Sequence, residues 1–274
     1  MASSASGETP NACWAEIDDA GPGAGVPSMR LGPLTTVCNA LLSVILAPSC
    51  AVCESLIDRP LGGPVCEACW NEVRGLAPPL CDACGEPLRT WRPRDVAEHR
   101  CPRCRRTRRL VRRAQALGAY DGALRSIIHA FKYEGRRSLG RRLSKTMRDQ
   151  AGDLLEGADA VVPVPLHAAR RRERGFNQAV DLASGLGRPV LHGLVRIRAT
   201  AVQAELPEAQ RHRNVRGAFA ARRAVTAWRG AVVVLVDDVS TTGATLESCA
   251  TALLDVGIVE VRALTAARAV RRQP

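Results

Sequence analysis

Aromatic residues are scarce in this sequence, since three Phe, four Trp and two Tyr make up only 3% of its 274 residues. The core must therefore be built mainly from Ala, Val and Leu. Lysine is almost absent as well: Lys132 and Lys145 are the only two, so arginine carries nearly all of the positive charge. The apolar content of 46% and the charged content of 24% are nevertheless ordinary for a globular protein. A chain of this length has room for one sizeable domain and a second, small one.

Long hydrophobic runs are also missing. The apolar run at residues 37–47 is too short to span a bilayer, and the residues Ala-Pro-Ser before Cys50 form a poor lipoprotein cleavage site. We therefore expect a cytoplasmic protein without membrane insertion. Apolar residues recur in this run at helical spacing, which predicts a short amphipathic helix packed on the body of the protein; they are Val37, Leu41, Val44 and Ile45.

Cysteine, in contrast, is abundant. Eight of the eleven cysteines form four C-x-x-C pairs, and two sulfurs at this spacing can bind one tetrahedral metal ion. A disulfide framework in a secreted protein is the alternative, but the regular spacing favours structural zinc bound by thiolates in a reducing compartment. Loops of 12 and 16 residues favour two sequential four-cysteine sites, although an interleaved arrangement stays open. The first site would comprise Cys50, Cys53, Cys66 and Cys69, and the second Cys81, Cys84, Cys101 and Cys104.

The charge balance points to an anionic partner. The formal net charge is +12, and eight thiolates with two Zn²⁺ would change it by −8 + 4 = −4, to +8. A phosphorylated metabolite or a nucleic acid would suit this charge. Ten arginines lie between Arg92 and Arg113 and could follow the phosphates of single-stranded DNA. Because Trp91 is the one aromatic residue near them, a merely solvated face is the alternative.

Three regions differ in pattern. Residues 1–30 are small, polar and rich in Gly and Pro, and we predict that they are disordered. Residues 34–106 hold the amphipathic helix and the cysteine pairs. Residues 110–270 alternate short apolar strands with amphipathic helices, which predicts an α/β fold with a parallel sheet. We expect strands at 114–120, 158–165, 189–197, 231–238 and 259–268, helices at 123–135, 138–150, 176–187 and 245–257, and an arginine-rich loop after residue 165.

One stretch, VVVLVDDVSTTGATL at residues 232–246, carries the clearest chemistry. A buried strand ends on Asp237 and Asp238 and is followed by a loop of small hydroxyl residues at the start of a helix, where free N–H groups attract anions. The acids suit hydroxyl groups or a Mg²⁺ that touches a pyrophosphate. Phosphoribosyl pyrophosphate offers a phosphate, hydroxyls and a pyrophosphate together. A capped helix with solvated acids is the alternative, and no P-loop ATPase motif occurs.

The segment LVDDVSTTGATL resembles the phosphoribosyl pyrophosphate signature of type I phosphoribosyltransferases. Together with the segments at 131–135, 162–179, 196–203 and 211–219, it resembles the ComF (ComF/GntX) family, which is associated with natural competence. This resemblance implies a type I phosphoribosyltransferase-like parallel sheet flanked by helices and preceded by a small double zinc ribbon. It also implies an enzyme that transfers the phosphoribosyl group to an acceptor. The alternative is a non-catalytic module that binds single-stranded DNA and DNA-uptake or recombination proteins.

The resemblance assigns roles to single residues. Asp237 and Asp238 would contact the ribose hydroxyls, with Mg²⁺ nearby, during catalysis. The 5′-phosphate would be held by Ser240, Thr241, Thr242, Gly243, Ala244 and Thr245. The pyrophosphate would be held by the segment after residue 165, with Arg170, Arg171, Arg172, Arg174 and Gly175 as candidates. Lys132 is a further candidate, and an exposed position on a helix is its alternative. The arginines, too, could belong to a solvated face.

Overall fold

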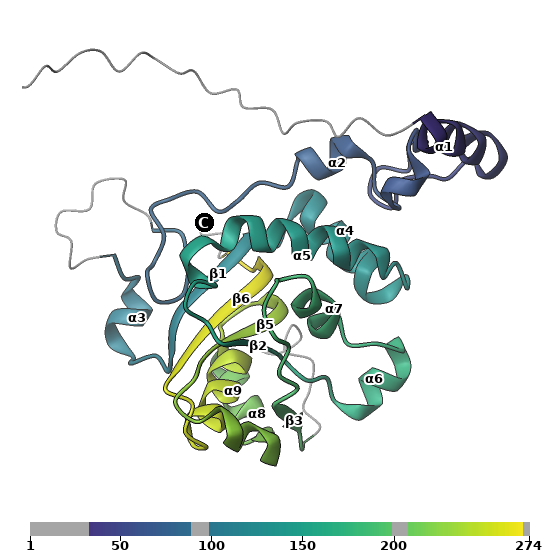
Figure 1. Cartoon of the computed structure of the whole chain (residues 1–274). Coiled ribbons are helices and arrows are strands. Elements are labelled where there is room, and N and C mark those ends of the chain that lie inside the picture. The colour runs from purple at the N-terminus through teal and green to yellow at the C-terminus, as the bar shows by residue number, and fades with distance from the viewer. Residues whose placement is uncertain (1–32, 89–98, 199–207, 271–274) are drawn as a thin grey trace, which may run out of the picture.

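The main body contains a four-stranded, all-parallel sheet with strand order β1-β6-β5-β2 (Figure 1). The computed structural model describes residues 33–88, 99–198 and 208–270, so the prediction for residues 1–30 lies outside it. The strands of the sheet are β1 (Val111–Ala119), β2 (Ala160–Pro163), β5 (Val232–Ser240) and β6 (Glu260–Arg268). Four of the five expected strands are therefore confirmed at shifted boundaries.

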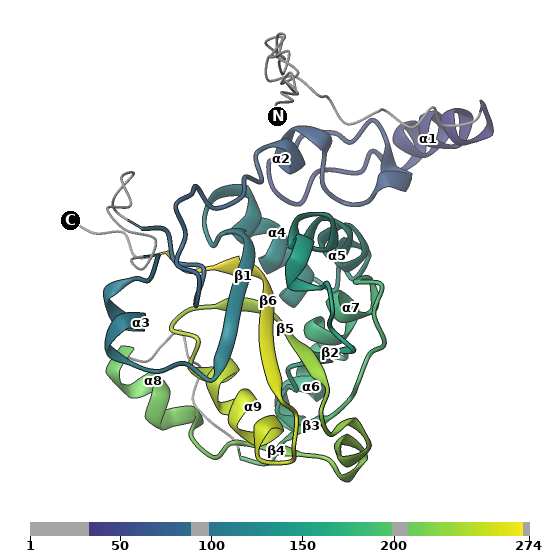
Figure 2. The ribbon, with the colours of Figure 1, turned by 60° about the vertical axis from the view of Figure 1, so that its left-hand side comes forward.

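Alternate residues of strand β5 belong to two core clusters, one on each face of the sheet. Val233 and Leu235 belong to one core cluster together with the apolar side of α9 (Ala244–Leu254). Val234 and Val236 point to the opposite face and belong to a second cluster, which is built largely from α4 (Gly122–Tyr133), α5 (Ser138–Ala151) and α7 (Gln178–Ser184). Figure 2 shows α9 on one side of the sheet and these helices on the other. Burial on both faces accounts for the unbroken run of apolar residues in β5.

Two expectations for the middle of the chain are wrong. Residues 189–197 do not form a continuous strand of the sheet: Val190 makes one isolated parallel bridge to Val161 of β2, and β3 (Leu194–Arg196) pairs antiparallel with β4 (Phe219–Ala221) instead. The expected arginine-rich loop contains a helix, α6 (Ala168–Arg174). Its first turn is capped by the His167 side chain, which accepts from the Ala169 N–H, and Gly175 ends it in a left-handed conformation. Ala and Arg are good helix formers, which explains the helix. The remaining elements here are η3 (Gly152–Leu154), α8 (Glu208–Val215) and η5 (Arg223–Trp228).

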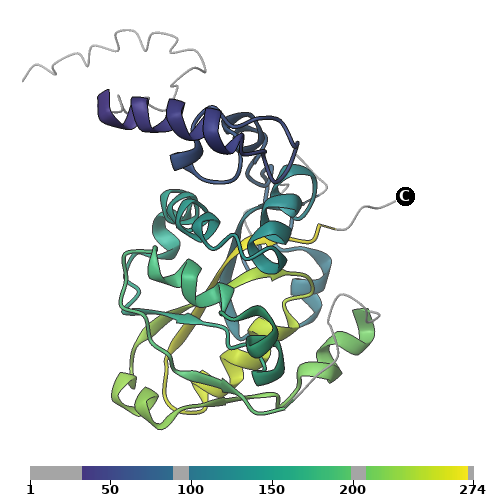
Figure 3. The same cartoon turned by 90° about the vertical axis from the view of Figure 1, so that its right-hand side faces the viewer.

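The N-terminal helix α1 (Pro33–Leu46) forms as predicted, but it does not pack on the body. Its apolar side chains face solvent, with Val44 82% and Leu34 80% exposed. One link joins it to the short helix η1 (Pro60–Gly62), where the Leu61 N–H donates to Asn39 Oδ1 at 3.0 Å. Figures 1 and 3 show α1 on the far side of the cysteine-rich region from the sheet. None of the helices described has both the length and the apolar character needed to cross a membrane.

The cysteine-rich region contains α2 (Glu67–Asn71) and α3 (Pro102–Arg106) and attaches to the body in two ways. Its first half shares a core with the sheet, because Ile57 and Trp70 belong to the cluster that contains α4 and α5. The guanidinium of Arg142 on α5 lies 4.6 Å from the centroid of the Trp70 ring and pairs with Glu67. The second half has a small apolar cluster of its own and joins the sheet through the ion pair of Glu86 with Arg268 of β6. The two halves are therefore coupled to different parts of the body.

Candidate functional site

The two predicted acids are the sixth and seventh of the nine residues of β5, toward the carboxyl edge of the sheet where parallel α/β folds bind ligands. Asp238 pairs with Lys132, the second last residue of α4, with 2.7 Å between Oδ1 and Nζ. Only 13% of the Asp238 side chain and 12% of the Lys132 side chain are exposed. One of the two lysines of the chain is thus committed to a partly buried ion pair at this edge. Lys132 therefore does not occupy the exposed position on a helix that was the alternative for it.

Asp237 has a different electrostatic environment from its neighbour. Burial and the negative charge of Asp238 raise the pKa of Asp237 to about 7, although the Asp238 N–H, Lys132 and Arg196 act in the opposite direction. The Asp238 N–H donates to Asp237 Oδ1 at 2.9 Å. A carboxyl with a pKa near neutrality is poised to accept a proton or a hydrogen bond from a ligand hydroxyl.

Arg196 is a neighbour of the acids that the sequence reasoning missed. It ends β3, and its guanidinium lies over the ring of Phe219 on β4, 5.3 Å from the ring centroid. Burial lowers the pKa of Arg196, Arg170 lowers it further, and Asp237 raises it. Arg196 is therefore close enough to both Asp237 and Arg170 to interact with them electrostatically. The segment 196–203 carried part of the family resemblance, and this was the one signal that could have pointed to it.

The predicted pyrophosphate-binding arginines lie on α6, directly after β2, but they differ in surroundings. Arg171 and Arg172 are exposed, as is Gly175, whereas Arg170 interacts electrostatically with Arg196. Arg174 is held in place: it donates to Gln178 Oε1 at 3.2 Å and to the Tyr133 hydroxyl at 3.1 Å. Of the four arginines, Arg170 and Arg174 are thus the half-buried ones with neighbours near the site.

The loop from Ser240 to Thr245 has the features of an anion cradle. Within the described residues, the backbone N–H groups of Thr241, Thr242 and Gly243 donate to no protein acceptor. Gly243 has φ +76°, a conformation that a glycine adopts without strain, and Ala244 begins α9 immediately after it. The Oγ of Ser240 is buried, and it too has no protein partner among these residues. Free donors before a helix N-terminus suit a phosphate group.

The eight paired cysteines come together in the two predicted sequential sets, not in an interleaved arrangement. In each set the four sulfur atoms lie within 4.8 Å of one another, and backbone N–H groups donate to some of them, as from Cys66 to Cys50 Sγ at 3.3 Å. Four thiol ligands with such donors fit a closed tetrahedral zinc site. We call these sets the first cysteine cluster, Cys50, Cys53, Cys66 and Cys69, and the second cysteine cluster, Cys81, Cys84, Cys101 and Cys104.

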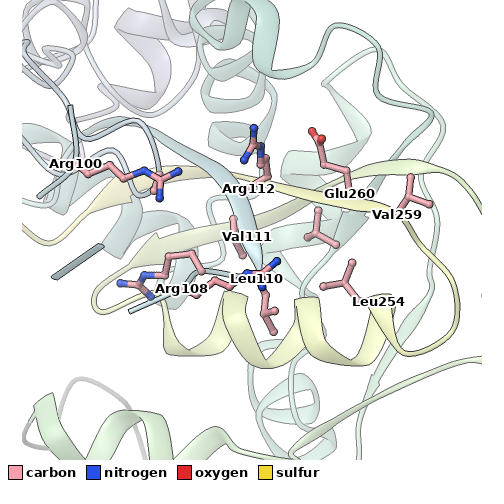
Figure 4. A pocket seen from close by; sticks show the side chains of 11 residues that line it. Arg100, Arg108, Leu110, Val111, Arg112, Leu254, Val259 and Glu260 are labelled. Carbon is pink, nitrogen blue, oxygen red and sulfur yellow. The ribbon is translucent and has the colours of Figure 1, made fainter. Parts of the chain in front are cut away.

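A second candidate site is a cavity of about 650 Å³ between the second cysteine cluster and the edge strand β1 (Figure 4). It lies near the amino ends of β1 and β6, at the opposite edge of the sheet from Asp237. Three exposed arginines line it, and no carboxylate among the residues described pairs with them; they are Arg100, Arg108 and Arg112. We call this cavity the arginine groove. Part of the predicted arginine stripe thus forms a concave, positively charged surface.

Comparison with known proteins agrees with this architecture. Residues 41–105 match the model of a double zinc ribbon domain and residues 172–273 that of a phosphoribosyl transferase domain. Competence protein F of Haemophilus influenzae is 34% identical over 163 residues, which cover 56% of this chain and 71% of that protein. The chain belongs to the ComF family. Its predicted fold, a phosphoribosyltransferase-like sheet preceded by a zinc-ribbon region, is confirmed.

Other ComF-family relatives are similar over comparable lengths. The DNA utilization protein YhgH of Escherichia coli is 34% identical over 175 residues, covering 59% of this chain and 74% of that protein. Competence protein ComFC of Bacillus subtilis is 29% identical over 149 residues, covering 54% and 60%. Among solved structures, a glutamine phosphoribosylpyrophosphate amidotransferase from B. subtilis matches 51% of this chain and 30% of its own, at 25% identity and a TM-score of 0.35.

Proposed function

We propose that this ComF-family chain binds phosphoribosyl pyrophosphate with Mg²⁺ at the carboxyl edge of its sheet and transfers the phosphoribosyl group to an acceptor. One arrangement carries the proposal: a carboxylate pair with its lysine is followed, three residues later, by a loop with three unused backbone N–H groups. A plain capped helix does not need this combination. The names of the relatives, which refer to competence and DNA utilization, support a role in DNA uptake.

The residues divide the ligand among them in this proposal. The loop from Ser240 to Thr245 holds the 5′-phosphate, and Asp237 and Asp238 accept hydrogen bonds from the ribose hydroxyls. Arg170 and Arg174 face the pyrophosphate. Bound Mg²⁺ would neutralise the pyrophosphate as it leaves. Because the reaction centre becomes cationic when the C1–pyrophosphate bond breaks, fixed carboxylates and correct positioning can supply the catalysis without a protein nucleophile.

Zinc would have a structural role. Each cysteine cluster supplies four sulfurs and no open position, so we propose one Zn²⁺ in each. The ten cysteines in the described ranges form no disulfide, and thiolate ligands require a reducing environment. Both points support the prediction of a cytoplasmic protein.

Calorimetric titration with phosphoribosyl pyrophosphate and Mg²⁺ tests the site directly. We expect saturable binding by the wild type and a loss of about 150-fold or more when Asp237 and Asp238 are both replaced by Asn, because two hydrogen bonds to charged groups disappear. The exposed Asp58 provides a matched control, and Asp58→Asn should bind like the wild type. No binding by the wild type would refute the proposed ligand, and unchanged binding by the double variant would refute the proposed site.

The arginine groove supports a second candidate function, the binding of single-stranded DNA. Exposed arginines without carboxylate partners can follow phosphates regardless of base sequence. We expect Arg108→Ala/Arg112→Ala to weaken binding of a single-stranded oligonucleotide and to reduce the slope of log K against log[salt] by about 1.4, or about 0.7 for each lost contact. Arg141→Ala removes an equally exposed arginine from α5, on the other face of the sheet, and should leave the slope unchanged. Equal slopes for all three proteins would refute the groove as the DNA site.

A further inference from the structure

Two buried arginines connect the second cysteine cluster to the phosphate loop, although they come from opposite ends of the transferase-like region. The first is Arg109, which follows the last ligand of the cluster by five residues. Its guanidinium interacts electrostatically with the Cys104 thiol and approaches Glu247 Oε1 at 3.5 Å. Only 9% of its side chain is exposed. Its Nη1 lies 3.9 Å from the position that a Cβ on Gly243 would take, so Arg109 reaches the phosphate loop itself.

The second is Arg268, at the end of β6. Its side chain is 7% exposed, its Nε donates to Glu86 Oε2 at 2.7 Å, and its Nη2 lies 3.7 Å from Cys84 Sγ. Its backbone is paired with Ser240, the first residue of the phosphate loop. The next residue donates from its N–H to the Ser240 carbonyl at 2.9 Å. The cluster is therefore connected to the loop from the side of β6 as well as from the side of α9.

The second cysteine cluster is also seated tightly on the sheet. Its Ala83 carbonyl accepts from the Ala114 N–H of β1 at 3.0 Å. A Cβ on Gly85 would lie 2.7 Å from the Ala114 carbonyl oxygen, which is closer than real Cβ atoms come to backbone. The cluster therefore cannot move freely relative to the sheet, and a change in its geometry is transmitted to the residues that contact it.

We infer that the second cysteine cluster fixes the position of the phosphate loop. Metal binding at this cluster and phosphate binding at the loop are then energetically coupled through Arg109. This inference rests on the proposed function of the loop. Four thiolates around one Zn²⁺ carry a net charge of −4 + 2 = −2, which holds the two arginines in place. Loss of the metal would allow the sulfurs to move apart, and Arg109 and Arg268 would no longer be held in fixed positions.

Glu247 provides the physical reason why Arg109 matters for an anion. It lies in the first turn of α9, where its negative charge opposes the binding of a phosphate at the same helix end. Arg109 and the Leu110 N–H, which donates to Glu247 Oε2 at 2.9 Å, hold and neutralise this carboxylate. If Arg109 moves away, the loop loses a support and the helix end retains an uncompensated negative charge. Arg109 is thus a positioning residue that acts through Glu247 and the loop.

Coupling between two sites is reciprocal, and this makes the inference testable without an enzyme assay. The full chain, loaded with zinc, is titrated with a competing chelator in the presence and absence of ribose 5-phosphate, and hydrogen exchange of residues 81–106 reports on the second cluster. We expect ribose 5-phosphate to raise the zinc affinity of the second cluster about fivefold or more. Arg109→Gln should still bind two zinc ions but lose this effect, whereas Arg106→Gln, which removes a nearby exposed arginine outside the arginine groove, should keep it.

A second measurement separates failure of this inference from failure of the proposed function. If ribose 5-phosphate does not bind to the wild type, the proposed ligand is refuted. Hydrogen exchange of residues 241–248 in the free protein then tests whether the second cysteine cluster stabilises the phosphate loop. We expect zinc removal and Arg109→Gln each to increase exchange in this segment. Unchanged exchange after both changes would overturn the inference, as would binding of ribose 5-phosphate that leaves zinc affinity at the second cluster unaltered.

Discussion

Replacing Asp237 by Asn should stabilise the protein while it weakens ligand binding. A pKa raised from 3.8 to about 7 means that keeping Asp237 ionised in the folded state costs about 4 kcal/mol. Asn has nearly the same shape, can still accept the hydrogen bond from the Asp238 N–H, and carries no charge. We expect a gain of about 2–4 kcal/mol in the free energy of unfolding at pH 8, the lower value allowing for water that reaches this partly buried side chain.

The pH dependence identifies the cause of this gain. Because the folded state holds the Asp237 proton more tightly than the unfolded state does, the contribution of Asp237 to stability is fully present below about pH 4 and is lost as the pH rises toward 7. The difference between Asp237→Asn and the wild type should therefore be small at pH 4 and should grow until about pH 7. Urea unfolding across this range measures it, with Asp58→Asn as the control for the loss of one exposed carboxylate.

Two results would refute this reasoning. A destabilised Asp237→Asn protein at pH 8 would mean that the Asp237 charge contributes favourable contacts that outweigh its burial. A gain that is equal at pH 4 and pH 8 would mean that the effect does not come from ionisation.

Binding of phosphoribosyl pyrophosphate should fall about 10- to 150-fold in the same variant, since one hydrogen bond to a charged group is lost. A group that lowers stability but is needed for binding is typical of a functional site.

Three further predictions concern the supports of the site. Lys132→Ala should cost about 3 kcal/mol in the free energy of unfolding, because it leaves a partly buried carboxylate unpaired. Lys145→Ala is the control, since it removes an exposed i,i+4 pair and should cost less than about 0.5 kcal/mol. Similar costs for the two variants would contradict the argument from burial. Arg142→Ala should lower the free energy of unfolding by about 1–2 kcal/mol, because the contacts with Trp70 and Glu67 are lost. Arg142→Lys should not restore this stability, because an ammonium group cannot reproduce the planar contact through two donors. Elemental analysis of the purified chain should find two zinc ions per molecule, and a value well below two would contradict the zinc-site interpretation.

Local patterns in the sequence were sufficient for much of the fold. The apolar run of β5 predicted a buried strand, and the turn to acids and small hydroxyl residues predicted that this strand ends and a helix follows. The regular C-x-x-C spacing predicted both cysteine clusters, because all the ligands of one cluster lie within a segment of about twenty residues. In each case the structural cause acts between residues that are close in sequence.

The expectations that failed depended on contacts that are distant in sequence. The spacing of Val37 and Leu41 predicted a helix correctly, but an apolar face does not say which surface covers it, and α1 remains exposed. Residues 189–197 have strand-like composition, yet only Val190 bridges to the sheet, at Val161 of β2, and residues 194–196 pair with β4 instead. Arg196 was missed, and Arg109 was assigned to the DNA-binding stripe although its side chain is only 9% exposed and approaches Glu247, because nothing near either arginine in the sequence identifies the acid it approaches.

The cysteine-rich region is best regarded as part of the scaffold of the candidate site. Contacts cross from it to the body at points that are far apart in sequence: Arg109 meets a residue 138 positions later, and Arg268 one 182 positions earlier. Its first half completes the core beneath α4, the helix that presents Lys132 to Asp238. Its second half contacts Arg268, which is paired with Ser240 of the phosphate loop, and is followed directly by Arg109, which lies beside Gly243. A chain shortened to residues 110–270 would lose the covering of α4 and both arginine contacts, so experiments on ligand binding should use the whole chain.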